Sequence, residues 1–235
     1  MSRLPAAIVF DFDGVIADTE RLHLDAMRAA LRGFSSPDHQ ITRSPDTSLE
    51  LSTEEYYARY LGFDDEGVFR LLMADRGIDP GDDRIRELVA EKSRGYDTLV
   101  ENAESILYPG AEACIRRFYG TVPLAIASGA YAHEIRDILR PAGLLSCFQT
   151  LVGCGDTPGG KPAADPYIEA AHRLDVDPHR CIAIEDSRWG IQSAVAAGMT
   201  CIAVTTNYQA HELPGAVVVV AGLDDVTMEL VERLS

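Results

Sequence analysis

The sequence predicts an α/β fold in which an open parallel sheet is interrupted by an all-helical insertion. Short, uninterrupted apolar runs alternate with helical patterns in the C-terminal half, which is typical of strands buried on both faces of a parallel sheet. One more apolar run, at 6–10, is separated from the others by a long stretch with helical periods only. We therefore expect a sheet-based domain formed by 1–18 and 106–235, and a helical domain formed by 19–105.

The apolar runs and the residues that flank them define the elements of the sheet domain. A helical period begins at Tyr131 and is broken at Pro141. Asp165, which precedes a proline, is expected to cap the next helix. Ser187 is expected to cap a third helix, which Gly198 ends. The expected strands are 6–10, 124–127, 150–153, 181–184, 201–204 and 217–220.

The insertion shows four helical periods and no convincing strand. Ser52 and Glu55 form a capping box before the second period. The segment 35–47 has the composition of a loop. Lys92 falls on the apolar face of the last period, where a charge is unusual. The apolar positions are Leu24, Met27 and Leu31; Tyr56, Tyr57 and Tyr60; Phe69, Leu72 and Met73; and Ile85, Leu88, Val89, Tyr96 and Leu99.

Composition excludes several classes of function. The 235 residues carry a formal net charge of −16, so the basic surface that nucleic acid or an anionic membrane requires is not expected. The sequence has no apolar stretch of about 18 residues that would span a bilayer. It begins without the features of a signal peptide, and its five cysteines are widely spaced. We expect a cytoplasmic protein with reduced thiols.

The segment after the first expected strand is the most informative. Asp11 and Asp13 follow the strand directly, and Gly14 allows the chain to turn sharply. The carboxyl ends of parallel strands line a ligand crevice, so both carboxylates can face one centre. Two carboxylates this close repel unless a cation offsets them, and a hard cation such as Mg²⁺ suits oxygen ligands. A surface turn is the alternative interpretation of this short string.

Four motifs in order resemble those of the haloacid dehalogenase superfamily. The resemblance covers nearly the whole chain and is weakest over 33–80. It implies a Rossmann-like parallel sheet core of the haloacid dehalogenase type with an inserted all-helical cap domain. The motifs are Asp11 to Thr19 (DFDGVIADT), Ser128 within Ala-Ser-Gly, Gly160-Lys161-Pro162 with Asp165-Pro166, and Glu185-Asp186-Ser187, and Tyr108-Pro109-Gly110 matches the return to the core.

The resemblance implies a role for each acidic residue. Asp11 would be the nucleophile, attacking a phosphate monoester to form an aspartyl-phosphate. Asp13 would be the general acid and base, and its presence favours phosphoryl transfer over cleavage of carbon–halogen bonds. Mg²⁺ would be held by Asp11, the backbone carbonyl of Asp13 and Asp186, with Glu185 bound directly or through water.

The other motif residues are expected to bind the phosphoryl group. Ser128 and the backbone N–H of Gly129 would hydrogen-bond its oxygens at a helix start, and Lys161 would neutralise it while holding Asp11 in place. The alternatives are a plain helix cap for Ser128 and a solvated loop lysine for Lys161. We expect Asp165 to be a helix cap and not a catalytic group.

Three residues of the insertion are candidate substrate contacts. Thr19 and His23 resemble hinge or substrate-contact positions of the family, and Lys92 could point from the cap into the crevice. The alternatives are a structural helix residue for His23 and a lysine whose ammonium reaches solvent at the rim of the apolar face for Lys92. Lys92 and Lys161 are the only lysines of the chain.

These residues predict a Mg²⁺-dependent phosphatase of a small phosphorylated metabolite, acting as a monomer or weak dimer. A sugar phosphomutase of the β-phosphoglucomutase type is the alternative. Those mutases have a cap loop of the form G-x-S-R-E-D-S, which the segment around Arg43 lacks, so hydrolysis is favoured. A non-catalytic binding protein of the same fold is disfavoured because every catalytic motif residue is present.

Overall fold

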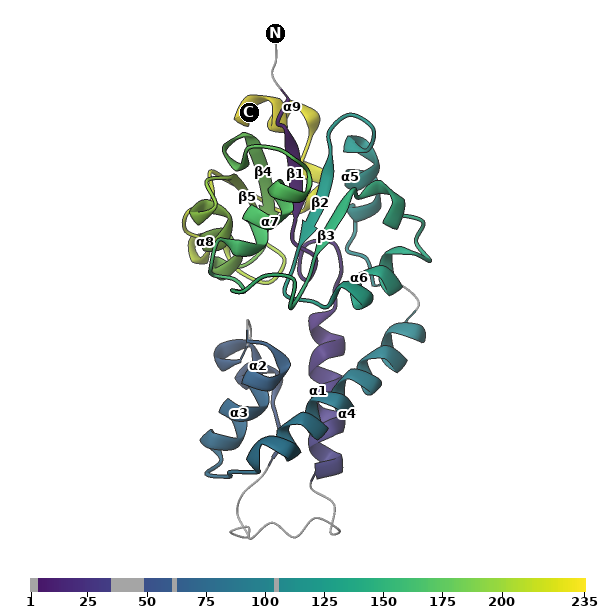
Figure 1. Ribbon diagram of the computed structural model, residues 1–235, viewed down its shortest axis with the longest axis vertical. Coiled ribbons are helices and arrows are strands. Elements are labelled where there is room, and N and C mark those ends of the chain that lie inside the picture. Colours follow the sequence, from purple (N-terminus) through teal and green to yellow (C-terminus); the bar gives the residue numbers. More distant parts are fainter. Residues whose placement is uncertain (1–3, 35–48, 61–62, 104–105) are drawn as a thin grey trace. The chain divides into compact units, whose positions relative to one another are not determined.

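The structure, a computed structural model, describes residues 4–34, 49–60, 63–103 and 106–235. It divides into two compact units, one formed by residues 1–18 and 105–235 and the other by residues 19–104. We call the first the sheet unit and the second the helical unit, and describe each by itself (Figure 1). The segment 35–47, including Arg43, lies outside the described residues.

The sheet unit contains six parallel strands in the spatial order β3-β2-β1-β4-β5-β6, which confirms the predicted fold class. Each expected apolar run forms a strand within a residue of its predicted bounds. Strand β1 lies inside the sheet, with β2 and β3 on one side and β4, β5 and β6 on the other. The loop that follows β1 therefore lies near the middle of the carboxyl edge of the sheet. The strands are β1 (Ala7–Phe10), β2 (Leu124–Ala127), β3 (Thr150–Val152), β4 (Cys181–Glu185), β5 (Thr200–Val204) and β6 (Val218–Val220).

Both faces of the sheet are buried, which explains why its strands are continuously apolar. On β1, Ala7 and Val9 face the core cluster that also contains Tyr167 and Ile191 from two helices. The alternate residues Ile8 and Phe10 are equally buried. The face of the sheet that contains Ala7 and Val9 consists mostly of Ala, Val and Cys. Small side chains let helices pack closely against the backbone on this side.

Helices flank the strands of the sheet unit (Figure 1). The cap predicted at Ser187 is confirmed, because its side chain accepts a hydrogen bond from the backbone N–H of Gly190. The cap predicted at Asp165 is wrong: Ala164 already has helical backbone angles and is the N-cap, which places Asp165 in the first turn. The helices are α5 (Ala111–Phe118), α6 (Ala132–Leu139), α7 (Asp165–Arg173), α8 (Arg188–Ala196) and α9 (Met228–Leu234).

The helical unit packs its apolar periods into a core of its own. The predicted positions Leu24, Phe69 and Leu88 are buried in one cluster with residues of all four helices. The cap at Ser52 is confirmed by a 3.0 Å hydrogen bond from the backbone N–H of Glu55. The helices are α1 (Glu20–Phe34), α2 (Thr53–Arg59), α3 (Asp65–Asp75) and α4 (Gly81–Glu101).

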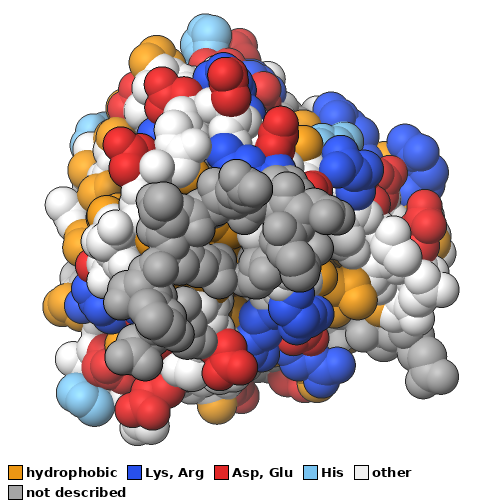
Figure 2. All heavy atoms as spheres, turned by 90° about the horizontal axis from the view of Figure 1, so that it is seen from below, with side chains coloured by type: hydrophobic (Ala, Val, Ile, Leu, Met, Phe, Trp, Pro, Cys, Tyr) orange, Lys and Arg blue, Asp and Glu red, His pale blue; other side chains and the backbone are white. Residues whose placement is uncertain are grey.

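Charged side chains of both signs lie next to one another on the face in Figure 2. In the helical unit, Arg76 pairs with Glu55 at 2.7 Å, and Arg70 pairs with both Glu66 and Asp82 at 2.8 Å. These arginines therefore have acidic partners at hand. Among the described residues, no helix combines the length and the apolar character needed to cross a bilayer.

Candidate active site

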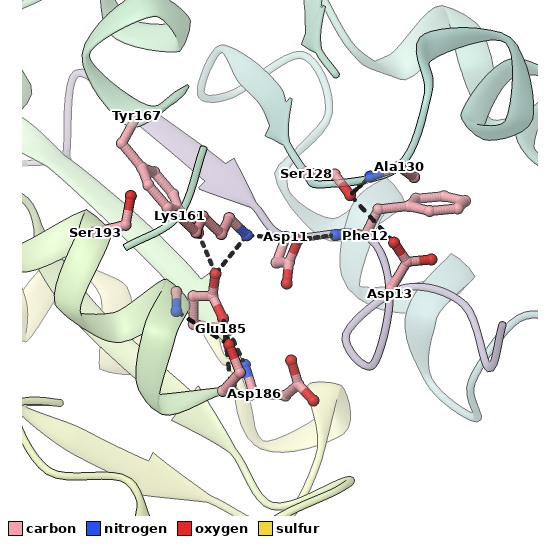
Figure 3. A network of polar contacts seen from close by, with 12 residues as sticks. Asp11, Phe12, Asp13, Ser128, Ala130, Lys161, Tyr167, Glu185, Asp186 and Ser193 are labelled. Atoms are coloured by element: carbon pink, nitrogen blue, oxygen red, sulfur yellow. Dashed lines mark hydrogen bonds and ion pairs between the residues drawn. The ribbon is translucent and has the colours of Figure 1, made fainter. Parts of the chain in front are cut away.

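Acidic side chains gather at the carboxyl ends of two adjacent strands of the sheet unit. Asp11 and Asp13 follow β1, Glu185 is the last residue of β4, and Asp186 comes directly after it. The two strands pair in parallel, so their carboxyl ends lie side by side. This is where open parallel sheets bind ligands. The fold itself brings together carboxylates that are far apart in the sequence (Figure 3).

Lys161 joins the two acidic loops. Its Nζ atom lies 2.7 Å from Oδ1 of Asp11 and 2.6 Å from Oε1 of Glu185. The ammonium also stands over the ring of Tyr167, at 5.2 Å from the centroid. Burial opposes the charged form, but the negative charges of Asp11 and Glu185 prevail and raise the pKa of Lys161 above its ordinary value. The charged form of Lys161 is therefore favoured within the site.

Glu185 is fully buried and held by donors on both oxygens. Oε1 accepts from Lys161 and, at 2.7 Å, from the hydroxyl of Tyr167. Oε2 accepts from the backbone N–H groups of Asp186 and Ser187 and from the Ser187 hydroxyl. A Cβ on Gly190 would lie 1.7 Å from Oε1, so glycine is needed there for the glutamate to fit. Glu185 thus has one fixed position.

Three carboxylates are arranged as a cation site would require. Asp11, Glu185 and Asp186 each offer one oxygen, and these atoms all lie within 4.8 Å of one another. Burial, followed by the charge of Glu185, raises the pKa of Asp11 to about 8 and that of Asp186 well above its usual range. The negative charge of three ionised carboxylates would exceed the single positive charge of Lys161. Carboxylate oxygens are the ligands that Mg²⁺ prefers, so this donor set fits that ion.

A second polar group lies beside the cluster. The hydroxyl of Ser128, just after β2, donates to Oδ2 of Asp13 at 3.3 Å and accepts from the backbone N–H of Ala130 at 3.0 Å. The Asp13 side chain therefore points toward Ser128 (Figure 3). The structure corrects the expected helix start, since α6 begins only at Ala132. Gly129 lies in the loop before it, and a Cβ there would meet open space.

Two contacts of the site were not predicted. The amide of Asn207, in the loop after β5, donates from Nδ2 to Oδ2 of Asp186 at 2.8 Å. The hydroxyl of Tyr167, on α7, donates to Oε1 of Glu185. A polar residue close behind a buried parallel strand is the signal that could have identified Asn207. No pattern in the sequence distinguishes the Tyr167 hydroxyl from that of any other buried tyrosine.

The remaining candidate residues belong to the helical unit. The ammonium of Lys92 lies 2.8 Å from Oδ2 of Asp65 and 2.6 Å from Nδ1 of His23. His23 also stacks on the ring of Tyr96, with centroids 4.2 Å apart. The backbone carbonyl of Thr19 accepts from the N–H of His23 at 2.9 Å. Lys92 thus has an anionic partner inside the helical unit, and its expected contact with substrate stays a prediction.

A parallel sheet with carboxylates and a lysine at its carboxyl edge defines an α/β enzyme of the Rossmann-like class. A sequence profile of the haloacid dehalogenase-like hydrolases matches residues 5–198. The chain therefore belongs to the haloacid dehalogenase-like hydrolase family, which confirms the predicted family and the prediction of an enzyme of phosphatase type.

Individual relatives have several activities. Fructose-1-phosphate phosphatase YqaB of Escherichia coli is 28% identical over 85% of this chain and 96% of its own length. Beta-phosphoglucomutase of Bacillus subtilis is 29% identical over 97% of this chain and 94% of its own. The crystal structure of CbbY from Rhodobacter sphaeroides in complex with phosphate superposes with a TM-score of 0.81 at 25% identity, covering 94% of this chain and 96% of the other.

Proposed function

We propose that the protein hydrolyses a small phosphorylated metabolite by transferring its phosphoryl group to Asp11. The observation that carries this proposal is the bridge that Lys161 makes between Asp11 and Glu185 beside Asp186. A carboxylate that attacks an anionic phosphate needs positive charge close by. Lys161 supplies one such charge, 2.7 Å from Oδ1 of the attacking carboxylate.

Hydrolysis would take place in two steps. An Asp11 oxygen attacks phosphorus, the ester P–O bond breaks, and Asp13 gives a proton to the leaving alkoxide. Asp13 then takes a proton from water, which attacks the aspartyl-phosphate and releases inorganic phosphate. Ser128 lies 3.3 Å from Asp13, so its hydroxyl can bind a phosphoryl oxygen next to the acid that protonates the leaving group. The backbone N–H of Gly129 would assist it.

Asp11 and Asp186, with the backbone carbonyl of Asp13 and with Glu185 directly or through water, would hold Mg²⁺. When bound, Mg²⁺ offsets phosphoryl charge and orients the oxygens. The five hydrogen bonds and ion pairs on Glu185 favour a water-mediated position for that residue over a direct one. Glu185 would then serve chiefly to hold Lys161.

A sugar phosphate is the substrate class that the relatives favour, because YqaB is named as a fructose-1-phosphate phosphatase. The helical unit would be the cap that selects the substrate, with Thr19, His23 and Lys92 as its predicted contacts. A cytoplasmic location and a monomeric or weakly dimeric state remain predictions from the sequence.

The direct test is phosphate release from a panel of sugar phosphates and small-acid phosphates, with Mg²⁺ and with a chelator. We expect release that requires Mg²⁺ and is abolished in Asp11→Asn. Glu112→Gln is a matched control, since this exposed carboxylate pairs only with Arg116 within α5 among the ion pairs of the described residues. Wild-type turnover in Asp11→Asn would overturn the covalent mechanism.

The likeness to beta-phosphoglucomutase over 97% of the chain supports phosphomutase activity as a second candidate. Incubation with β-glucose 1-phosphate and a trace of the 1,6-bisphosphate separates the two functions. Glucose 6-phosphate without free phosphate would identify a mutase. Free phosphate would identify the phosphatase that we propose.

A further inference from the structure

The loop that follows β5 is bound to both acidic loops of the site, although it belongs to none of the motifs. The Thr206 hydroxyl donates to the backbone carbonyl of Gly14, in the loop after β1. Asn207 donates from Nδ2 to Oδ2 of Asp186, in the loop after β4, at 2.8 Å. Two consecutive residues therefore connect the segments that carry the candidate ligands of the cation.

The three loops are in close contact at this point. Gly14 has a φ of +80°, and a Cβ there would lie 2.2 Å from Oδ2 of Asp186 and 2.7 Å from Nδ2 of Asn207. Glycine is thus required both by the backbone angle and by the approach of the two side chains. Because β4 and β5 pair in parallel, with Glu185 beside Ala203, the loop after β5 emerges next to Asp186.

The hydrogen bond of Asn207 restrains the carboxylate of Asp186, which neighbouring negative charges repel. Asp186 is 4% exposed and faces the negative charges of Glu185 and Asp11. An ionised carboxylate only accepts hydrogen bonds, so the amide nitrogen of Asn207 must face it. Asn207 donates to Oδ2 of Asp186, which leaves Oδ1 of the same carboxylate available to bind a cation. The amide can therefore fix the rotamer without competing for the metal.

We propose that Asn207 and Thr206 are positioning residues that hold Asp186 and the loop after β1 in the geometry that binds the divalent cation. The proposal rests on the cation site of the proposed function. Partners of this kind, which orient a ligand without touching the metal, commonly change metal affinity by about 10- to 100-fold when they are removed. We expect the affinity for Mg²⁺ to depend on both side chains.

The test is titration calorimetry of Mg²⁺ alone with the full chain, for the wild type, Asn207→Leu and Thr206→Val. Each variant should bind Mg²⁺ about 10-fold more weakly. The Mg²⁺ concentration for half-maximal phosphate release should rise by a similar factor, while kcat at saturating Mg²⁺ changes little. Thr205→Val is the matched control, because the Thr205 hydroxyl, from the same loop, donates to the backbone carbonyl of Val220 in β6 and to neither acidic segment.

Thr206→Ser keeps the hydroxyl and should restore the wild-type affinity, which separates positioning from a general effect on folding. If Asn207→Leu does not fold, the comparison of Thr206→Val with Thr206→Ser still tests the positioning role. Unchanged Mg²⁺ affinity in folded Asn207→Leu, or in Thr206→Val, would overturn the positioning role alone. A wild type that binds no Mg²⁺ would overturn the cation site of the proposed function and, with it, this inference.

Discussion

Lys161 is the residue on which the electrostatics of the site depend. It is the only side chain cation among the described residues that contacts the carboxylates of Asp11 and Glu185. Its long side chain reaches both from the segment between β3 and α7, so one charge serves two loops. Without it, two buried carboxylates would face each other with no ammonium between them.

Replacing Lys161 with methionine should abolish activity and destabilise the metal-free protein. Removing one partner of a buried ion pair costs roughly 3–5 kcal/mol, because the other charge stays buried. Denaturant unfolding in the presence of a chelator measures this loss. A Lys161→Met variant as stable as the wild type would show that the bridge to Asp11 and Glu185 does not hold the site together.

Tyr167→Phe should have a smaller effect, since only one donor to Glu185 is lost. A hydrogen bond to a charged group contributes roughly 1.5–3 kcal/mol. We expect a lower free energy of unfolding and a lower kcat, because Glu185 also orients Lys161. Tyr119→Phe, at a residue that is 50% exposed, provides the control. Equal effects of the two substitutions would contradict the role assigned to the Tyr167 hydroxyl.

The sequence was most informative about residues whose chemistry is unusual for their place. A carboxylate directly after a buried strand, as at Asp11, predicts a site. Asn207 carries the same signal more weakly, because an amide in a loop is common and its partner Asp186 is 21 positions away. Such a contact depends on which strands are neighbours in the sheet, and the pattern of apolar runs does not reveal the order of the strands.

At the scale of elements, helices α1, α3 and α4 meet at a polar cluster around the buried Lys92. His23, Asp65 and Lys92 contribute one side chain each, and Tyr96 of α4 stacks on the imidazole. Because a lysine only donates, Nδ1 of His23 must be the acceptor and Nε2 carries the proton in the neutral ring. Burial, followed by the charge of Lys92, lowers the pKa of His23 well below its usual value.

This lowered pKa predicts acid sensitivity. His23 takes up a proton more readily in the unfolded chain than in the folded one, so its contribution to stability is present above about pH 6.5 and is lost as the pH falls below that value. Denaturant unfolding at pH 7.5 and 5.5 should show a smaller loss in His23→Asn than in the wild type. Identical losses in the two proteins would contradict the neutral state of His23.

The strands were easier to predict than the caps of helices. Continuous apolar runs such as that of β4 have few alternatives in an α/β chain. The start of α7 depends instead on the backbone angles of Ala164, which no side chain signals, so the cap was wrongly placed at Asp165. The helical period was correctly expected from Tyr131, the N-cap of α6, but Ser128 and Gly129 were wrongly expected at the helix start.

At the scale of the whole molecule, the net charge of −16 contrasts with the anionic substrate that we propose. The sequence indicated both halves of this contrast, the acidic composition directly and a phosphorylated substrate through the family resemblance. The balance between them is local: Lys161 and a bound cation would make one edge of the sheet favourable for phosphate. The spatial order of the six strands, which creates that edge, was not predicted, because runs of similar length and composition do not encode their neighbours.

Mg²⁺ should therefore stabilise the protein, and more so at higher pH. The pKa of Asp11, about 8 in the metal-free fold, lies above its unfolded value, so this group's contribution to stability is lost as the pH rises toward 8. Mg²⁺ needs the deprotonated carboxylates and replaces the missing positive charge. Thermal unfolding at pH 6 and 8, with Mg²⁺ or a chelator, measures both effects. An increment from Mg²⁺ that is equal in Asp186→Asn and in the wild type would place the ion elsewhere.

The central claim is that Asp11 receives the phosphoryl group, and acid quenching during turnover tests it most directly. Mass spectrometry of the quenched protein, incubated with Mg²⁺ and a sugar phosphate that it hydrolyses, should find a phosphoryl group on the peptide that contains Asp11. With p-nitrophenyl phosphate, whose leaving group needs no proton from Asp13, the modified fraction should be larger in Asp13→Asn, in which the group that activates water is lost. Unmodified Asp11 in both proteins, together with phosphate release by Asp11→Asn, would contradict the account.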